Sequence, residues 1–162
     1  MDVSAFYSLF SATCFALVGL WWNVVEKRQE WFKDEAMKTI AGGVYLSFLL
    51  PGLMGLGAQI GGENGFLWRL AFAVGSGFGI FYTFKLLDKT KNGPYTGPFR
   101  RNRWLVVVIY GFILLGSLGF DFIFTLVNIQ PLQVEAFWLC LLILLGHGLA
   151  WDFLTQPKAA QV

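Results

Sequence analysis

The sequence predicts an all-α integral membrane protein, a bundle of five transmembrane helices. Of its 162 residues, 56% are hydrophobic and 14% are charged, whereas soluble domains have about 25% charged residues. A mean hydropathy of +0.60 indicates a chain that faces lipid over much of its surface. A soluble domain would need far more polar surface than 12 basic and 10 acidic side chains supply.

Five apolar segments have the length of about 20 residues that a helix needs to cross a bilayer. The predicted spans, which form a single transmembrane domain, are residues 3–25, 40–60, 66–87, 104–128 and 136–154. Small side chains recur on one face of the first span, at Ser8, Ala12, Ala16, Gly19 and Asn23. The third span has Gly75 and Gly79 one turn apart. Such patterns let helices approach closely, within one chain or between copies of it.

Two further segments affect the predicted arrangement of the helices. Pro51-Gly52 predicts a kink in the second span, because proline removes a backbone donor and clashes one turn back. Interrupted helices line binding sites in transporters, but a packing kink is the more ordinary interpretation. The connection 26–39 has charges of both signs and no Gly or Pro, so it either continues the first helix or lies in the membrane interface.

The basic residues predict the orientation of the bundle. Apart from Arg69, all of them lie in the connections 26–39 and 88–103, in the tail, or at Lys85 beside the second connection. The positive-inside rule assigns that side to the cytoplasm, so the N-terminus is expected outside and the C-terminus inside. A four-span variant with an interfacial first helix would place the N-terminus inside. We expect the cell membrane as the location, as a multi-pass protein of a bacterial plasma membrane.

Asp121 is the most unusual polar residue, because a carboxylate inside an apolar segment costs at least about 2.5 kcal/mol. Arg69 enters the third span from the same outer side, within reach of an ion pair with Asp121. One helix face is expected to hold Ser117, Asp121, Thr125 and Asn128, with Gln59 of the second span nearby. The result would be a polar pocket that opens outward. Alternatively, the ion pair only fixes helix register.

His147 and Asp152 are the candidate polar residues of the last span. His147 is the only histidine, near mid-membrane, and imidazole titrates close to neutral pH, which suits a proton carrier or a pH sensor. A lone histidine is more often a hydrogen-bonded packing residue. Asp152 lies deeper toward the cytoplasmic end and is expected to face a neighbouring helix, toward Asn23 or Lys85.

Several kinds of chemistry have no matching motif. The sequence has no Cys-x-x-Cys pair, no His-rich helix and no Glu-x-x-His spacing, so no metal or haem site is expected. It has no phosphate-binding loop of Walker type, and no cofactor is expected. Cys14 and Cys140 fall at different depths and are interpreted as packing residues. The net charge of +2 does not favour a nucleic-acid partner.

Three classes of function remain. The first is an oligomeric channel or transporter that moves protons, ions or a small solute past Arg69 and Asp121. The second is a non-catalytic sensor, accessory or lipid-binding subunit, in which that pair holds the fold. The third is an intramembrane enzyme, which is the least favoured because no nucleophile lies beside His147. The expected partners are the lipid bilayer and further copies of the chain in a homo-oligomer.

Overall fold

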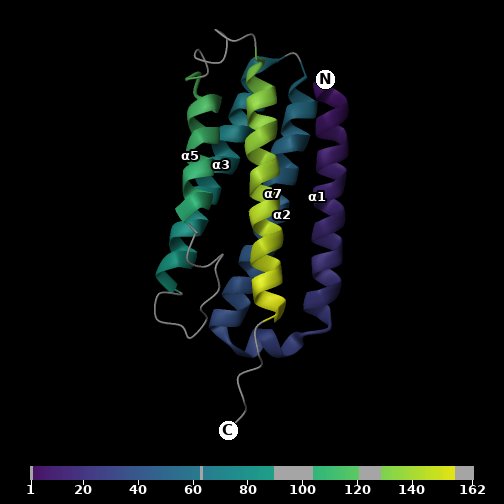
Figure 1. Cartoon of the computed structure of the whole chain (residues 1–162), viewed down its shortest axis with the longest axis vertical. Coiled ribbons are helices and arrows are strands. Elements are labelled where there is room, and N and C mark those ends of the chain that lie inside the picture. Colours follow the sequence, from purple (N-terminus) through teal and green to yellow (C-terminus); the bar gives the residue numbers. More distant parts are fainter. Residues whose placement is uncertain (1, 63, 90–103, 121–128, 156–162) are drawn as a thin grey trace.

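The computed structural model describes residues 2–62, 64–89, 104–120 and 129–155, which form an elongated helical bundle (Figure 1). Within these ranges the chain has five α-helices, one short 3₁₀ segment and no strand. The elements are α1 (Val3–Glu26), η1 (Gln29–Lys33), α2 (Glu35–Gly61), α3 (Gly65–Lys89), α5 (Trp104–Ser117) and α7 (Pro131–Thr155). Four of these helices, α1, α2, α3 and α7, are long and apolar enough to cross a membrane. The predicted all-α membrane class is confirmed to this extent.

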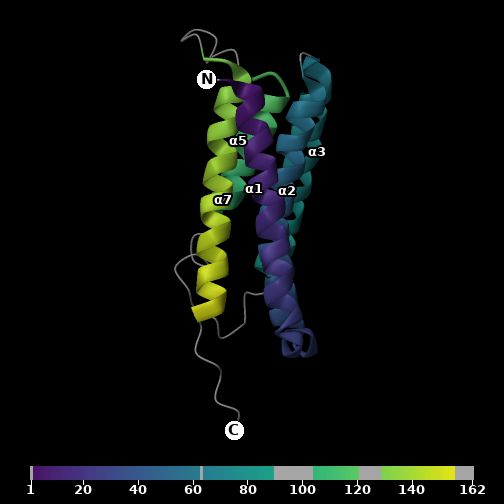
Figure 2. The same ribbon diagram turned by 90° about the vertical axis from the view of Figure 1, so that its right-hand side faces the viewer.

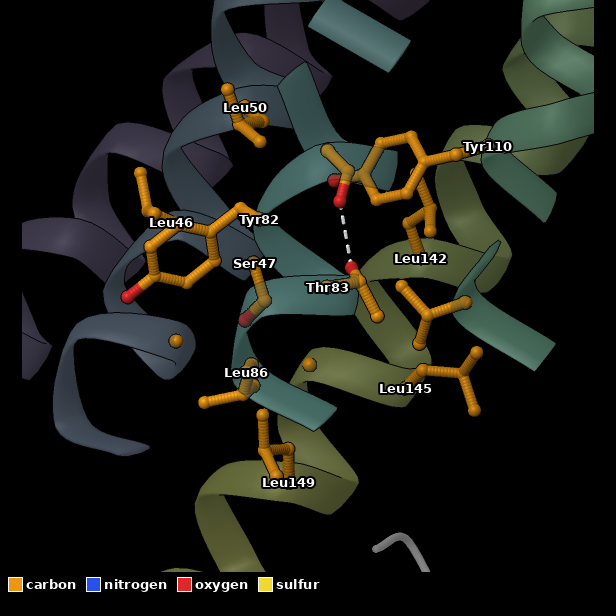
Figure 3. A pocket seen from close by; sticks show the side chains of 14 residues that line it. Leu46, Ser47, Leu50, Tyr82, Thr83, Leu86, Tyr110, Leu142, Leu145 and Leu149 are labelled. Atoms are coloured by element: carbon orange, nitrogen blue, oxygen red, sulfur yellow. Dashed lines mark hydrogen bonds between the residues drawn. The ribbon is translucent and has the colours of Figure 1, made fainter. Parts of the chain in front are cut away.

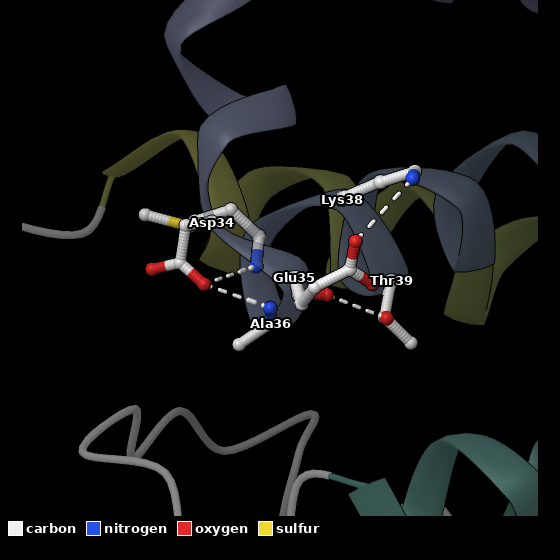
Figure 4. A network of polar contacts seen from close by, with 6 residues as sticks. Asp34, Glu35, Ala36, Lys38 and Thr39 are labelled. Carbon is white, nitrogen blue, oxygen red and sulfur yellow. Dashed lines mark hydrogen bonds and ion pairs between the residues drawn. The ribbon is translucent and has the colours of Figure 1, made fainter.

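The charged connection after α1 breaks the helix instead of continuing it. Arg28 leaves the helical region at φ −124° and ψ 48°, and η1 crosses beneath the bundle. Asp34 then starts α2 earlier than predicted, since its carboxylate accepts from the amides of Ala36 at 2.7 Å and Met37 at 3.4 Å (Figure 4). Side-chain oxygens at this position satisfy amides that a helix start leaves without partners.

Helix α5 is shorter than predicted, because a glycine motif ends it. Gly119 has a φ of 96°, and Phe120 donates its amide to the carbonyl of Leu115 at 3.1 Å. Together with the bond from Gly119 to Gly116, this is the pattern of a Schellman ending. The predicted continuous helix over 104–128 is therefore interrupted after Ser117. Asp121, Thr125 and Asn128 lie outside the described residues.

Four of the helices form a closed ring. Helix α2 packs on α3, α3 on α5, α5 on α7, and α7 back on α2. Helices α3 and α7 face each other across the ring, without substantial contact in the described chain. Helix α1 lies outside the ring, mainly against α2, as the two views in Figures 1 and 2 agree. The centre of the ring is therefore the natural place for a core or a cavity.

The upper half of the ring in Figure 1 is filled by apolar side chains. Within one buried apolar cluster, each ring helix contributes one residue that is at most 1% exposed: Met54, Phe72, Ile113 and Leu139. We call these four residues the core layer. A second apolar cluster lies at the lower end, where Trp31 of η1 contacts Phe153 of α7 at 4.6 Å and Trp21 of α1 at 6.1 Å between ring centroids. Burial of such rings anchors η1 to the bundle.

The small residues of α3 pack against other helices, whereas those of α1 do not. Gly75 and Gly79 of α3 contact Met54 and Tyr110, as expected for helix packing. On α1, by contrast, the side chains that face the bundle are Tyr7, Ser11, Cys14, Trp21 and Val25. The predicted stripe of Ser8, Ala12, Ala16, Gly19 and Asn23 is exposed. It therefore does not pack within the described chain.

Gly61→Ala is expected to destabilise the turn between α2 and α3. A Cβ at Gly61 would lie 2.8 Å from the backbone nitrogen of Trp68, which cannot move like a side-chain tip. Overpacking of this kind costs about 1 to 3 kcal/mol. Gly77→Ala in α3 is the control, because nothing lies within 4 Å of its added Cβ. Thermal unfolding in detergent should show a lower midpoint for Gly61→Ala only; equal midpoints would contradict the close approach.

Candidate functional site

A cavity of about 70 Å³ lies inside the ring, between α2, α3, α5 and α7 (Figure 3). Its lining comes from all four ring helices: Gly43, Leu46, Ser47, Leu50, Gly79, Tyr82, Thr83, Leu86, Val106, Tyr110, Leu142, Leu145, Gly146 and Leu149. Most of these side chains are apolar, and no charged residue is among them. Pockets with this composition take apolar molecules and orient them with a few polar groups.

Glycines and the core layer explain why the cavity lies where it does. Gly146 lets α7 approach α2, since a Cβ there would lie 2.7 Å from the Oγ of Ser47. Gly79 likewise leaves room for the ring of Tyr110, because a Cβ added at Gly79 would lie 2.5 Å from the Cζ of Tyr110. The side chains that line the space below the core layer are mostly leucine, glycine and small polar residues, whereas Phe72 is fully buried in the core layer. Space therefore remains below the core layer.

The polar groups of the cavity differ in their hydrogen bonding. Thr83 donates its hydroxyl to the carbonyl of Gly79 at 2.7 Å, and Ser47 donates to Val44 at 2.7 Å. Tyr110 is 3% exposed, and its hydroxyl makes no hydrogen bond to the described parts of the chain. The hydroxyl of Tyr82 points away from Leu142 and Leu145, toward Gly42 (Figure 3). Tyr110 is thus the hydrogen-bond donor that the cavity leaves available.

A second group of polar residues lies at the upper end of the bundle. Each of the five helices contributes one of them, and we call them the upper polar layer: Tyr7, Gln59, Arg69, Ser117 and Glu135. Gln59 donates to the carbonyl of Tyr7 at 2.9 Å and to Ser11 at 3.4 Å, and Tyr7 donates to Leu132 at 2.7 Å. These bonds tie α1, α2 and α7 together.

Arg69 connects α3 to the end of α5. Its Nη1 donates to the carbonyl of Gly116 at 3.0 Å and to that of Ser117 at 3.4 Å. The guanidinium lies 4.7 Å from the ring centroid of Trp68. A cation at the carbonyl end of a helix also interacts favourably with the helix dipole. The carboxylate of Glu135, 2% exposed, packs against Gly116 on the other side of α5.

The predicted site residues are divided among three places. Arg69 and Ser117 are in contact in the upper polar layer, whereas Gln59 at the same end bonds to Tyr7 and Ser11 of α1. His147 is exposed on α7, where its Nδ1 lies 2.9 Å from the carbonyl of Ile143 and its ring contacts Phe48 at 5.2 Å. Asp152 is half-buried near the lower end of α7. The pair of Arg69 with Asp121 stays a prediction, because Asp121 is outside the described residues.

Sequence reasoning missed Glu135 and the cavity residues. The predicted fifth span began at residue 136, which left Glu135 just outside that span, yet α7 begins at Pro131. Proline favours the first position of a helix, so Pro131 was a usable signal. From that start, Glu135, Leu139, Leu142 and Gly146 follow at spacings of four, three and four, which places the acid on the buried face.

The cavity and the upper polar layer are separate compartments. The core layer fills the ring between them, with Phe72 and Ile113 fully buried. Within the described ranges, no three His, Cys, Asp or Glu side chains gather as a metal site would require. Both cysteines are free thiols, Cys14 buried and Cys140 exposed. Comparisons with protein-family models, with curated proteins and with solved structures found no match.

Proposed function

We propose that this chain is a non-catalytic membrane protein that binds one neutral, lipid-like molecule inside the four-helix ring. One observation supports this most strongly: the described residues that line the cavity include no charged side chain, and the buried core layer lies above them. A charged ligand would lose its hydration without gaining an opposite charge, which is costly in a low-dielectric site. An apolar molecule gains about 25 cal/mol for each Å² of surface that it removes from water.

We also propose an orientation of the helix bundle in the membrane. The alternating helix directions bring the last turns of α1, α3 and α7 to the same end of the bundle, and the basic residues of the sequence follow α1 and α3. The positive-inside rule makes that end cytoplasmic, so the N-terminus and the upper polar layer face outward. The cavity then lies in the cytoplasmic half of the membrane. A kink at Pro51-Gly52 would act directly on its upper boundary, because Leu50 lines the cavity.

Leu145→Trp is expected to displace the ligand by filling the cavity. Leu145 lines the cavity from α7, whereas the neighbouring Leu144 is 71% exposed on the opposite face. Leu144→Trp is therefore a control with the same change in composition on the same helix. Neutral lipids retained by each purified protein are quantified after extraction. We expect a loss of at least about fivefold for Leu145→Trp and none for Leu144→Trp. Equal retention by both variants would contradict binding in the cavity.

Transport is the second candidate, and the upper polar layer is the observation that favours it. A buried carboxylate at Glu135, with Arg69 and Gln59 at the same end, is the kind of arrangement that marks ion or solute pathways in membranes. Since the core layer fills the ring, the pathway would lie between copies of the chain or require the core layer to move. The exposed small residues of α1 offer a face for a homo-oligomer.

Flux of protons or small ions into liposomes tests this second candidate. The wild-type chain is compared with Glu135→Gln, Asp121→Asn and His147→Ala at equal amounts of reconstituted protein. Transport predicts a reduced flux for Glu135→Gln and Asp121→Asn. Equal flux in the three variants and the wild type would remove these residues from any pathway, and no flux above empty liposomes would remove transport itself.

A further inference from the structure

We propose that the molecule in the cavity is a neutral alcohol whose hydroxyl group binds at Tyr110 and Thr83. This inference rests on the proposed function, because it names the chemical class of the ligand for the same cavity. Three features of the cavity support it. The hydroxyl side chains in the lining offer a donor and an acceptor, the described lining residues carry no charge, and the cavity is long enough for a short alkyl chain.

Tyr110 provides a donor without a partner. The residue is 3% exposed and its ring packs over Gly79 of α3, so the phenol is held away from both membrane surfaces. Its hydroxyl makes no hydrogen bond within the described chain, and Tyr110 lines the cavity. An acceptor brought by a ligand would give this hydroxyl a hydrogen bond inside the cavity, which would be favourable there.

Thr83 provides an acceptor beside this donor. Its hydroxyl hydrogen is used in the 2.7 Å bond to the carbonyl of Gly79, the residue on which the Tyr110 ring lies. Figure 3 shows Thr83 below the Tyr110 ring, at the same end of the cavity. A threonine oxygen that has donated its hydrogen still has lone pairs that can accept. One donor and one acceptor therefore come from side chains that both contact Gly79.

An alcohol matches this pair better than other neutral or charged groups. A hydroxyl can accept from Tyr110 and donate to Thr83 at the same time. A ketone or an ester can only accept, and a hydrocarbon can do neither. A carboxylate or an ammonium group would introduce a charge with no charged side chain among the described lining residues to balance it.

The size of the cavity limits the apolar part of the ligand. From the level of Leu142, near Tyr110, to the level of Leu149, the lining extends over seven residues of α7, which is about 10 Å at a rise of about 1.5 Å per residue. An octyl chain is of this length, but its volume exceeds the cavity volume of about 70 Å³, so part of the chain would extend beyond the lining residues. Leu86, Leu145 and Leu149 at that lower end provide an apolar environment for it (Figure 3).

Two matched photoreactive probes test the inference, namely octanol and octane with a diazirine at the same carbon. Each probe is titrated against the full chain in phosphatidylcholine nanodiscs, and the labelled residues are located by peptide mass analysis. We expect the alcohol to label lining residues such as Leu142 and Leu145 at lower concentration than the hydrocarbon does. Tyr110→Phe should raise the half-saturating concentration of the alcohol about three- to tenfold, which is the loss of one hydrogen bond.

The controls separate the possible outcomes. Tyr45→Phe removes a phenol that packs on Trp22, outside the cavity, and should leave both titrations unchanged. Labelling of the cavity by the hydrocarbon should not respond to Tyr110→Phe. If both probes label the cavity equally and Tyr110→Phe changes the labelling by neither probe, the proposal of an alcohol ligand is wrong. The proposal of a binding cavity is then still supported. If Tyr110→Phe weakens the binding of both probes, Tyr110 contributes packing and not a hydrogen bond. That result also overturns the inference. If neither probe labels the cavity of the wild type, the proposed function itself fails.

Discussion

Phe72→Ala is expected to destabilise the bundle by about 3 to 5 kcal/mol, the range for removing a buried phenylalanine ring. Phe72 is 0% exposed at the centre of the core layer, with its ring edge-on to Tyr7 at 6.2 Å and to Trp68 at 5.7 Å. The variant would leave an empty space between the upper polar layer and the cavity. Thermal unfolding in detergent, followed by circular dichroism, measures the loss.

Phe81→Ala on the same helix is the matched control, because Phe81 is 64% exposed on the outer face of α3. It should lower the unfolding midpoint much less than Phe72→Ala does. Similar midpoints for both variants would contradict the assignment of Phe72 to the core. If the second candidate function holds, Phe72→Ala should also increase ion flux, since it removes the side chain that separates the two compartments.

Arg69→Met is expected to destabilise the upper end of the bundle by about 2 to 3 kcal/mol, because hydrogen bonds to charged groups are each worth about 1.5 to 3 kcal/mol. Methionine keeps much of the side-chain length, but it cannot donate to the carbonyls of Gly116 and Ser117. In a membrane, water is not available to replace the lost donor. Hydrogen exchange at the end of α5, together with the unfolding midpoint, measures the effect.

Two further variants distinguish a hydrogen-bonding role from a charge pair. Arg69→Lys should recover part of the stability, because an ammonium can reach one carbonyl but lacks the fork geometry of arginine. If Arg69 also pairs with Asp121, exchanging the two residues should recover the stability lost in Asp121→Asn. Wild-type stability in Arg69→Met would show that the bonds from Arg69 to α5 contribute nothing.

The helices were predictable where apolar length alone determines them. The bounds of α1 and α3 agree closely with the predicted spans, because lipid requires a continuous helix over about 20 residues. The end of α5 was not predicted, since Gly119 lies within an apolar run that looks like the middle of a span. A local glycine conformation therefore overrode hydropathy at that point. The stripe through Ser117 assumed a helical register that stops there.

The candidate site was only partly predictable, for a different reason. Arg69, Gln59 and Ser117 were found because a polar residue in an apolar segment is conspicuous by itself. The cavity depends on which helices close the ring and on which turns of α2 and α7 meet, and a single sequence does not state those pairings. The lining leucines look like any others in a membrane helix, and Tyr110 has no distinctive spacing. Only the packing of Tyr110 on Gly79 shows its position.

The electron density inside the ring, in crystals grown from a lipid phase, tests the central claim most directly. The account predicts elongated density among Leu142, Leu145 and Leu149 that ends within hydrogen-bond distance of the Tyr110 hydroxyl. The core layer above it should be free of solvent. Leucine side chains collapsed across the space, or a file of water molecules that passes Phe72 to reach Glu135, would contradict the account.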